Sequence, residues 1–194
     1  MSDRATRTPS LLVRGEVRRA ALAILEEEGP EGFTVRAIAR RAHVAPMAIY
    51  NHFGGLNGVI EALWIEGFES FRDALSLRSE DPGQGLVDAG LAYRAFALAH
   101  PGLYGVMFRH PFRHFEPSPE AAELAALTFQ TLVSMIERAQ AIGFFARQSA
   151  SDAAQVIWSA CHGYVALELQ DMNFADDRDR AYRLLLATLR DGFR

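Results

Sequence analysis

The chain has 194 residues, 49% of them hydrophobic, which is enough to bury a core in one compact domain or in two small ones. It contains no run of about 18 apolar residues, and its single cysteine excludes an intrachain disulfide, so we expect a cytoplasmic protein that does not contact a membrane. The net charge is −4, yet residues 1–53 carry +2 and the remainder −6. This asymmetry is typical of a protein that offers one end to phosphate.

The first residues have the composition of a flexible arm followed by a helix. Residues 1–9 are polar and include Arg4 and Arg7, which can reach phosphate or a minor groove, although a terminus without any role is the simpler interpretation. From Ser10 onward, apolar residues recur at the spacing of one helical face, and Gly29-Pro30 ends this helix. The residues of that face are Val13, Val17, Ala20, Ala21 and Ile24.

Residues 34–53 predict two short helices joined by a tight turn. Thr34 is a hydroxyl N-cap for the first helix, and Pro46 stands at the first position of the second, where its missing N–H costs nothing. Residues 43–45 form the turn between them. A helix-turn-helix of this kind lays its second helix in the DNA major groove while the first crosses the backbone. We therefore interpret residues 10–55 as a DNA-binding domain.

The same residues resemble the DNA-binding domain of the TetR family of transcriptional repressors. The most specific match is the Tyr50-x-His52-Phe53 ending of the second helix. The other matching residues are Arg14, Ala20 to Gly29, Phe33-Thr34, Ile38-Ala39 and Val44 to Asn51. Two positions depart from the family pattern: His43 replaces the usual turn glycine, and no Lys follows Phe53. A residue other than glycine takes positive φ at a cost, and the missing Lys removes a phosphate contact, so we expect weaker DNA binding than is usual for the family.

The helix-turn-helix offers two sets of candidate DNA contacts. Ala and Met side chains can contact a thymine methyl group, whereas an Asn side chain can pair with adenine. The candidates for contacts with base edges are Ala45, Pro46, Met47 and Asn51. Phosphate contacts set register and affinity without reading sequence. The candidates for phosphate contacts are Thr34, Arg36, Tyr50 and His52.

The rest of the chain, residues 56–194, predicts a helical regulatory and dimerisation domain. Its expected helices cover residues 57–77, 82–99, 102–109, 119–142, 151–172 and 175–193, which makes the protein all-α with about nine helices. The motifs His100-Pro101-Gly102-Leu103-Tyr104 and Trp158-x-x-x-His162-Gly163 resemble the regulatory domain called WHG, which occurs in TetR-family proteins. This resemblance implies a ligand-responsive homodimer.

The helix expected over residues 151–172 is apolar on two opposite faces, so it needs two neighbours. One face is lined by small residues that permit close approach of a twofold partner, and the last helix can extend it into a four-helix interface. The candidate dimer residues are Val156, Ala160, Gly163, Leu167, Tyr182, Leu185, Leu186 and Leu189. Burial within a single chain is the alternative for this face.

The opposite face turns Trp158 and His162 inward, where other aromatic side chains can converge on them. An aromatic lining with a few polar groups is typical of a small-molecule pocket, and an ordinary core is the alternative. The candidate effector-binding residues are Trp64, Phe68, Phe71, Tyr93, Phe96, His100, Tyr104, Met107, Phe108, Trp158 and His162. The expected ligand is largely apolar, with one or two groups that hydrogen-bond to His162, His100 or Tyr93.

The sequence gives little support to an enzyme or a metal protein. Cys161 and His162 are neighbours and point apart on a helix, and Pro111 breaks any helical spacing between His110 and His114. We expect no cofactor and no catalytic residue. The predicted function is a homodimeric repressor released from a palindromic operator by a small effector. The alternatives are a DNA-binding regulator without an effector, and a ligand-binding protein that has lost its grip on DNA.

Overall fold

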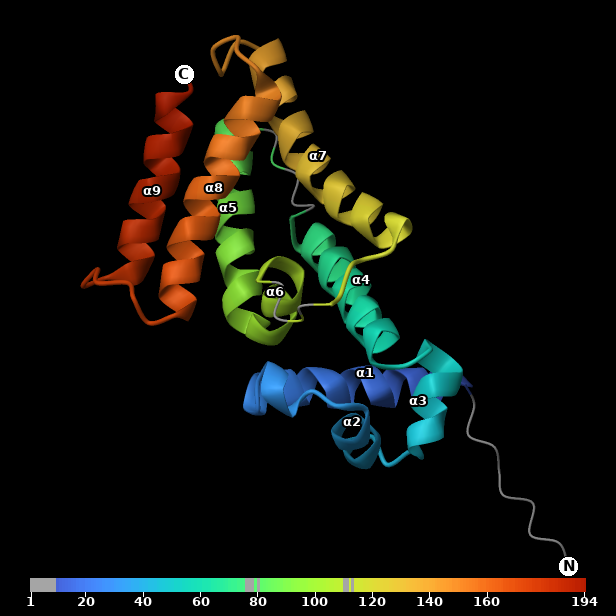
Figure 1. Cartoon of the computed structure of the whole chain (residues 1–194). Helices are drawn as coiled ribbons and strands as arrows, with labels where there is room; N and C mark the ends of the chain where they lie inside the picture. The colour runs from blue at the N-terminus through green and yellow to red at the C-terminus, as the bar shows by residue number, and fades with distance from the viewer. Residues whose placement is uncertain (1–9, 76–78, 80, 110–111, 113) are drawn as a thin grey trace, which may run out of the picture. The chain divides into compact units, whose positions relative to one another are not determined.

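The computed structural model describes residues 10–75, 79, 81–109, 112 and 114–194, and within them the only regular structure is helical (Figure 1). The expected all-α fold is therefore confirmed. No helix among these residues is long and apolar enough to cross a membrane. The elements are α1 (Ser10–Glu27), the 3-10 turn η1 (Pro30–Gly32), α2 (Val35–Arg41), α3 (Pro46–Phe53), α4 (Leu56–Leu75), α5 (Pro82–Ala99), α6 (Pro101–Phe108), α7 (Pro119–Ala141), α8 (Ala150–Leu169) and α9 (Arg178–Gly192).

The end of α8 and the start of α9 differ from the expected positions. α8 ends at Leu169, three residues early, and Asp171 just beyond it adopts a left-handed φ of 55°. α9 begins at Arg178, three residues late, because the Asp177 side chain accepts a hydrogen bond from the Arg180 N–H at 2.9 Å and acts as the N-cap. Both shifts lengthen the α8–α9 loop.

The chain divides into two compact units. The first contains Met1–Gly67 and Gly102–Ala121, and the second contains Phe68–Pro101 and Ala122–Arg194. One boundary falls inside α4, so this helix contributes residues to both units. The compact units thus differ from the division at residue 55 that the sequence suggests for function.

The first unit is built on the apolar face of α1. All five residues expected on that face are buried, and Val17 and Ala21 have no exposed surface at all. They pack against α2 and α3, whose Ile38 and Ile49 are also fully buried (Figure 1). Gly102 lies directly against Leu22 and Glu26 of α1, which brings α6 onto the same core.

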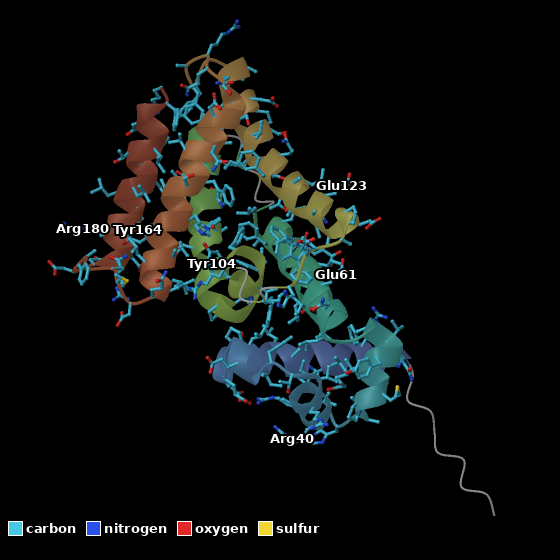
Figure 2. The ribbon with its side chains drawn as sticks, viewed as in Figure 1. Arg40, Glu61, Tyr104, Glu123, Tyr164 and Arg180 are labelled. Atoms are coloured by element: carbon cyan, nitrogen blue, oxygen red, sulfur yellow. The ribbon has the colours of Figure 1, made fainter. Side chains whose placement is uncertain are left out.

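In the second unit, α5, α8 and α9 pack against one another in all three pairs, and most of α7 and the end of α4 belong to the same unit (Figure 1). α5 and α9 approach closely at Gly90, which has no side chain. A Cβ added there would lie 2.3 Å from Leu186 Cδ2 of α9. The Tyr182 hydroxyl donates to the Gly90 carbonyl at 2.9 Å. On α8, the Tyr164 hydroxyl, labelled in Figure 2, donates to the Arg178 carbonyl at 2.7 Å.

A nearly buried arginine joins these three helices. Arg94 of α5 donates from Nε and Nη2 to the two carboxylate oxygens of Glu168 on α8, each at 2.6 Å, and from Nη1 to Asp179 of α9 at 2.6 Å. The side chains of Arg94 and Glu168 are only 13% and 6% exposed. Hydrogen bonding to Glu168, and then to Asp179, raises the pKa of Arg94 further above its ordinary value. The charge on Arg94 is therefore permanent, and it is neutralised by the buried Glu168 and by Asp179, whose side chain is 75% exposed.

Replacing Arg94 with methionine should lower the free energy of unfolding by about 3 kcal/mol or more, because Glu168 would keep a buried charge without its partner. Denaturant unfolding measures this change. The double variant R94M/E168M should recover most of the loss, since it removes both charges. The matched control is R178M, whose partner Asp171 is 88% exposed and whose loss should be under about 1 kcal/mol. Equal losses in R94M and R178M would contradict this role for Arg94.

Candidate nucleic-acid interface and regulatory core

The helix-turn-helix forms as the sequence predicts. The Thr34 hydroxyl oxygen accepts a hydrogen bond from the Ala37 N–H at 3.2 Å, which caps α2, and Pro46 occupies the first turn of α3. Between them, His43 adopts a φ of 54°, the left-handed conformation that favours glycine. The reversal is closed by the Val44 N–H, which donates to the Ala39 carbonyl at 3.0 Å. The turn is therefore well formed, at the conformational cost expected for a histidine.

α3 presents one face to the interior of the first unit and another to solvent. Ile49 is fully buried, whereas Met47 and Tyr50 are 64% and 52% exposed. The remaining candidate contacts with base edges, Ala45, Pro46 and Asn51, are exposed as well, and His52 is half-buried. The candidate base-edge residues thus form one accessible surface, with Tyr50 on the same surface.

The carboxyl end of α3 is held by a residue whose role the sequence did not reveal. Arg14 of α1 donates from Nη1 to the His52 carbonyl at 2.7 Å, and its guanidinium lies 4.9 Å from the centre of the Phe53 ring. A cation at the last carbonyls of a helix is stabilised by the helix dipole and by direct hydrogen bonding. Arg14 was visible only as a residue that matched the family pattern. The structure makes it a clamp on α3.

The arginines of α2 have different environments. Arg41 donates to both carboxylate oxygens of Glu27 at the end of α1, one of them at 2.6 Å, and lowers the pKa of Glu27. Arg36 and Arg40 are exposed, and Figure 2 shows Arg40 on α2 at the surface of the first unit. Arg36 therefore remains suited to a phosphate contact. Arg41 forms an ion pair with Glu27 at the protein surface, where the two side chains are 37% and 57% exposed.

α4 begins directly against the end of α3. Gly54 ends α3 in the left-handed conformation, with φ 73°. A Cβ added to Gly58, in the first turn of α4, would lie 1.7 Å from the Phe53 carbonyl oxygen. Only glycine permits this backbone approach, so Gly58 sets the packing of α4 on α3.

In the second unit, aromatic side chains from four helices gather around a polar pair. The Tyr93 hydroxyl of α5 lies 2.9 Å from His162 Nδ1 of α8. Trp158 packs on His162 with ring centres 5.9 Å apart, and Phe129 of α7 packs on Trp158 at the same separation. Phe71 of α4 contacts the Tyr93 ring at 5.2 Å. Phe129 was not among the candidates, because nothing in its local sequence distinguishes it from an ordinary core residue.

The other candidates for effector binding divide between the two units: three lie in the second unit with this cluster, and four lie in the first. Phe96 bridges Phe71 and His100, with ring centres 5.1 Å apart in both contacts, and Phe68 is buried in the same unit. The remaining four candidates belong to the first unit, and three of them are buried there. They are Trp64, which donates to the Ala121 carbonyl at 3.3 Å, the pair Tyr104 and Phe108, and the buried Met107.

Comparison with known proteins decides the family. Residues 17–63 match the model of bacterial regulatory proteins of the tetR family, and residues 86–189 match the tetracyclin repressor-like C-terminal domain. An uncharacterised HTH-type transcriptional regulator of Mycobacterium tuberculosis is 30% identical over 95% of this chain and 83% of its own length. The chain belongs to the TetR family. It is a DNA-binding transcriptional regulator.

Solved structures have the same fold as this TetR-family chain. A protein with unknown function from Rhodococcus sp. RHA1 superposes with a TM-score of 0.85 at 24% identity and covers 99% of both chains. A TetR variant from Acinetobacter baumannii in complex with minocycline has a TM-score of 0.65 at 23% identity, covering 92% of this chain and 94% of its own.

The candidate dimer residues of this TetR-family chain divide into two groups. Val156 and Leu167 of α8 are 53% and 47% exposed, and Gly163 between them is exposed. Ala160, Leu185 and Leu189 are half-buried. The accessible face of α8 therefore stays available to a partner. Leu184, 67% exposed on α9, lies outside the predicted set.

Tyr182 and Leu186 were placed wrongly in the dimer set. They are 0% and 2% exposed, because they pack on Gly90 of α5 within the same chain. Helical spacing groups them correctly on one face of α9. It cannot reveal that α5, distant in sequence, covers that face.

The structure also bears on the cysteine and histidines that the sequence analysis weighed as nucleophile or metal ligands. Burial raises the pKa of the Cys161 thiol, which keeps it protonated and a poor nucleophile at neutral pH. His114 is exposed. His110 and the arm of residues 1–9, with Arg4 and Arg7, lie outside the described residues.

Replacing His43 with glycine should raise the free energy of unfolding by about 0.5–1 kcal/mol, because glycine adopts the φ of 54° without steric cost. Thermal unfolding should then show a midpoint higher by about 2 °C for a chain of this size. H43A is the matched control, since it keeps the Cβ and should not stabilise. A glycine variant no more stable than H43A would show that the turn is not strained.

Replacing Gly58 with alanine should destabilise the first unit by about 2 kcal/mol, because the new Cβ must push α4 away from the Phe53 carbonyl. DNA binding should weaken as well, since α3 loses its packing partner. G105A is the control: an added Cβ there meets nothing within 4 Å, so this helical substitution should be neutral or stabilising. A G58A protein as stable as G105A would contradict the close packing.

Proposed function

We propose that this regulator is a ligand-responsive repressor that binds a palindromic operator as a homodimer. The observation that carries the proposal is the surface of α3, whose exposed residues Met47, Tyr50 and Asn51 lie opposite the buried Ile49. Two such helices, about 34–36 Å apart in a dimer, would enter successive major grooves. Residues 10–55 would form the DNA-binding domain, and residues 56–194 the regulatory and dimerisation domain.

The proposed contacts to DNA are of two kinds, those to base edges and those to phosphates. Ala45, Pro46, Met47 and Asn51 would meet base edges, since they share the exposed face of α3. Phosphates would be bound by Thr34, Arg36, Tyr50 and His52. α3 carries no arginine, and of the three arginines of α2 Arg41 is paired with Glu27, which leaves Arg36 and Arg40 as its unpaired cations. The salt dependence of binding should accordingly be modest for this class of regulator.

The effector would bind among the aromatic residues of the regulatory domain. Tyr93 and His162 provide a hydrogen-bonding pair surrounded by Phe71, Phe129 and Trp158, which suits a largely apolar ligand with one polar group. The structural neighbour from Acinetobacter baumannii is a TetR protein in complex with minocycline, which supports a small molecule in this class of domain. The effector would favour the conformation whose two heads do not match the operator spacing, and so release DNA.

The dimer would form through the exposed face of α8, extended by α9. Val156, Gly163 and Leu167 supply its apolar and small positions, and Leu185 and Leu189 lie partly accessible on α9. The small residues permit close approach of the twofold partner.

Selection of duplexes from a random pool by the purified full chain tests the DNA-binding proposal. We expect enrichment of a palindrome that is bound by a dimer, with affinity that falls as salt rises. R36A should weaken binding to every duplex equally and reduce the salt slope by about one. A folded dimer that enriches no sequence at low salt would contradict the proposal and favour a ligand-binding protein that has lost DNA binding.

A thermal-shift panel of apolar and aromatic small molecules tests the effector proposal. A ligand at a hundred times its dissociation constant should stabilise the protein by about 2.7 kcal/mol. Y93F should reduce the affinity of the active compound, because it removes the hydroxyl beside His162. Y164F is the matched control: it loses a hydroxyl bonded to the Arg178 carbonyl and should keep ligand affinity. If Y93F and Y164F bind the compound equally well, the effector does not bind at this pair.

A further inference from the structure

We propose that α3 reads A·T base pairs, with Met47 against a thymine methyl group and Asn51 on an adenine edge, and that this helix does not read guanine. The inference rests on the proposed function, because it names the base pairs that the DNA-binding surface recognises. It follows from which side chains of α3 are exposed and from what the nearby arginines already contact.

The exposed face of α3 is almost entirely apolar where it would first meet the bases. Ala45 and Pro46 are exposed, and Met47 has 64% of its surface accessible. These side chains cannot hydrogen-bond to the donor and acceptor groups of a base edge. The C5 methyl of thymine is the apolar group that the major groove presents, and Met47 is the longest side chain able to cover it. An exposed thioether at this position therefore favours thymine.

Asn51 lies one helical turn beyond Met47, on the same exposed face. Side chains four residues apart on a helix are neighbours, about 5–6 Å apart at their Cβ atoms, so the two can address nearby bases. A carboxamide pairs in bidentate fashion with the N6 and N7 atoms of adenine. Together, the two side chains match a short A·T segment in each half-site.

Guanine is read most often by arginine or lysine, and α3 contains neither. Of the arginines close to it, Arg14 of α1 donates to the His52 carbonyl at the carboxyl end of α3, and Arg41 of α2 forms an exposed ion pair with Glu27. Arg36 and Arg40 are exposed but belong to α2, the helix that crosses the phosphate backbone in this motif. Among the described residues of α3 that would meet base edges, Asn51 is thus the one whose side chain can hydrogen-bond to a base, and Met47 is the longest apolar one.

The test begins with the half-site that the full chain selects from a random duplex pool. Each thymine of that half-site is then replaced singly by deoxyuridine, which removes only the methyl group. One replacement should weaken binding about fourfold, the value of one buried methyl. The same replacement should have no effect on M47A. N51A should bind about tenfold or more weakly and lose the preference for adenine at one position.

Two controls separate base reading from general loss of affinity. R36A should weaken binding to all duplexes alike and leave the deoxyuridine effect intact. Circular dichroism and thermal unfolding should show M47A and N51A folded as the parent, because both side chains are exposed. Selected half-sites with G·C pairs at the positions that N51A relaxes, or thymines that tolerate deoxyuridine throughout, would overturn this inference and leave the proposed function standing. Enrichment of no sequence at all would overturn both.

Discussion

The second unit depends on the largely buried charge of Arg94. A guanidinium cannot lose its charge in a protein, so its burial requires the carboxylate of Glu168 and the nearby one of Asp179. These three residues belong to α5, α8 and α9, so their ion pairs link all three helices. Tyr93 and His162 lie on two of the same helices and meet at 2.9 Å within that arrangement. The aromatic cluster and the exposed face of α8 therefore both lie on helices that the ion pairs of Arg94 link.

The DNA-binding domain has an equivalent requirement, namely that α3 stay rigid while exposing one face. Three features hold α3 in place: the left-handed turn at His43, the hydrogen bond from Arg14 to the His52 carbonyl, and the close backbone approach of Gly58 to Phe53. Each holds α3 from the protein side and leaves Met47 and Asn51 accessible. The helix-turn-helix thus keeps its form although His43 adopts the left-handed conformation that favours glycine.

Much of this organisation could be predicted from local sequence. The helix-turn-helix, the Thr34 cap, the position of Pro46 and the buried face of α1 follow from spacing and capping rules, which act within a few residues. The inward direction of Trp158 and His162 followed from helical periodicity, and the structure confirms that both contact aromatic partners.

What could not be predicted depends on contacts between distant parts of the chain. Arg94 and Glu168 are 74 residues apart, and each looks like an ordinary surface charge in its own helix. Arg14 contacts a backbone carbonyl, which leaves no trace in the side chains around it. The burial of Tyr182 depends on Gly90, whose lack of a side chain matters only once α9 covers it.

In the proposed function, the effector site and the operator site are linked in one thermodynamic cycle, since an effector that releases DNA must bind the DNA-free state more tightly. The most direct test is the affinity of an effector found by ligand screening, measured for the free dimer and for the dimer saturated with its selected operator. We expect the operator to weaken effector binding by the same factor by which the effector weakens operator binding. Equal effector affinity in the two states would show that the regulatory domain does not control the DNA-binding domain.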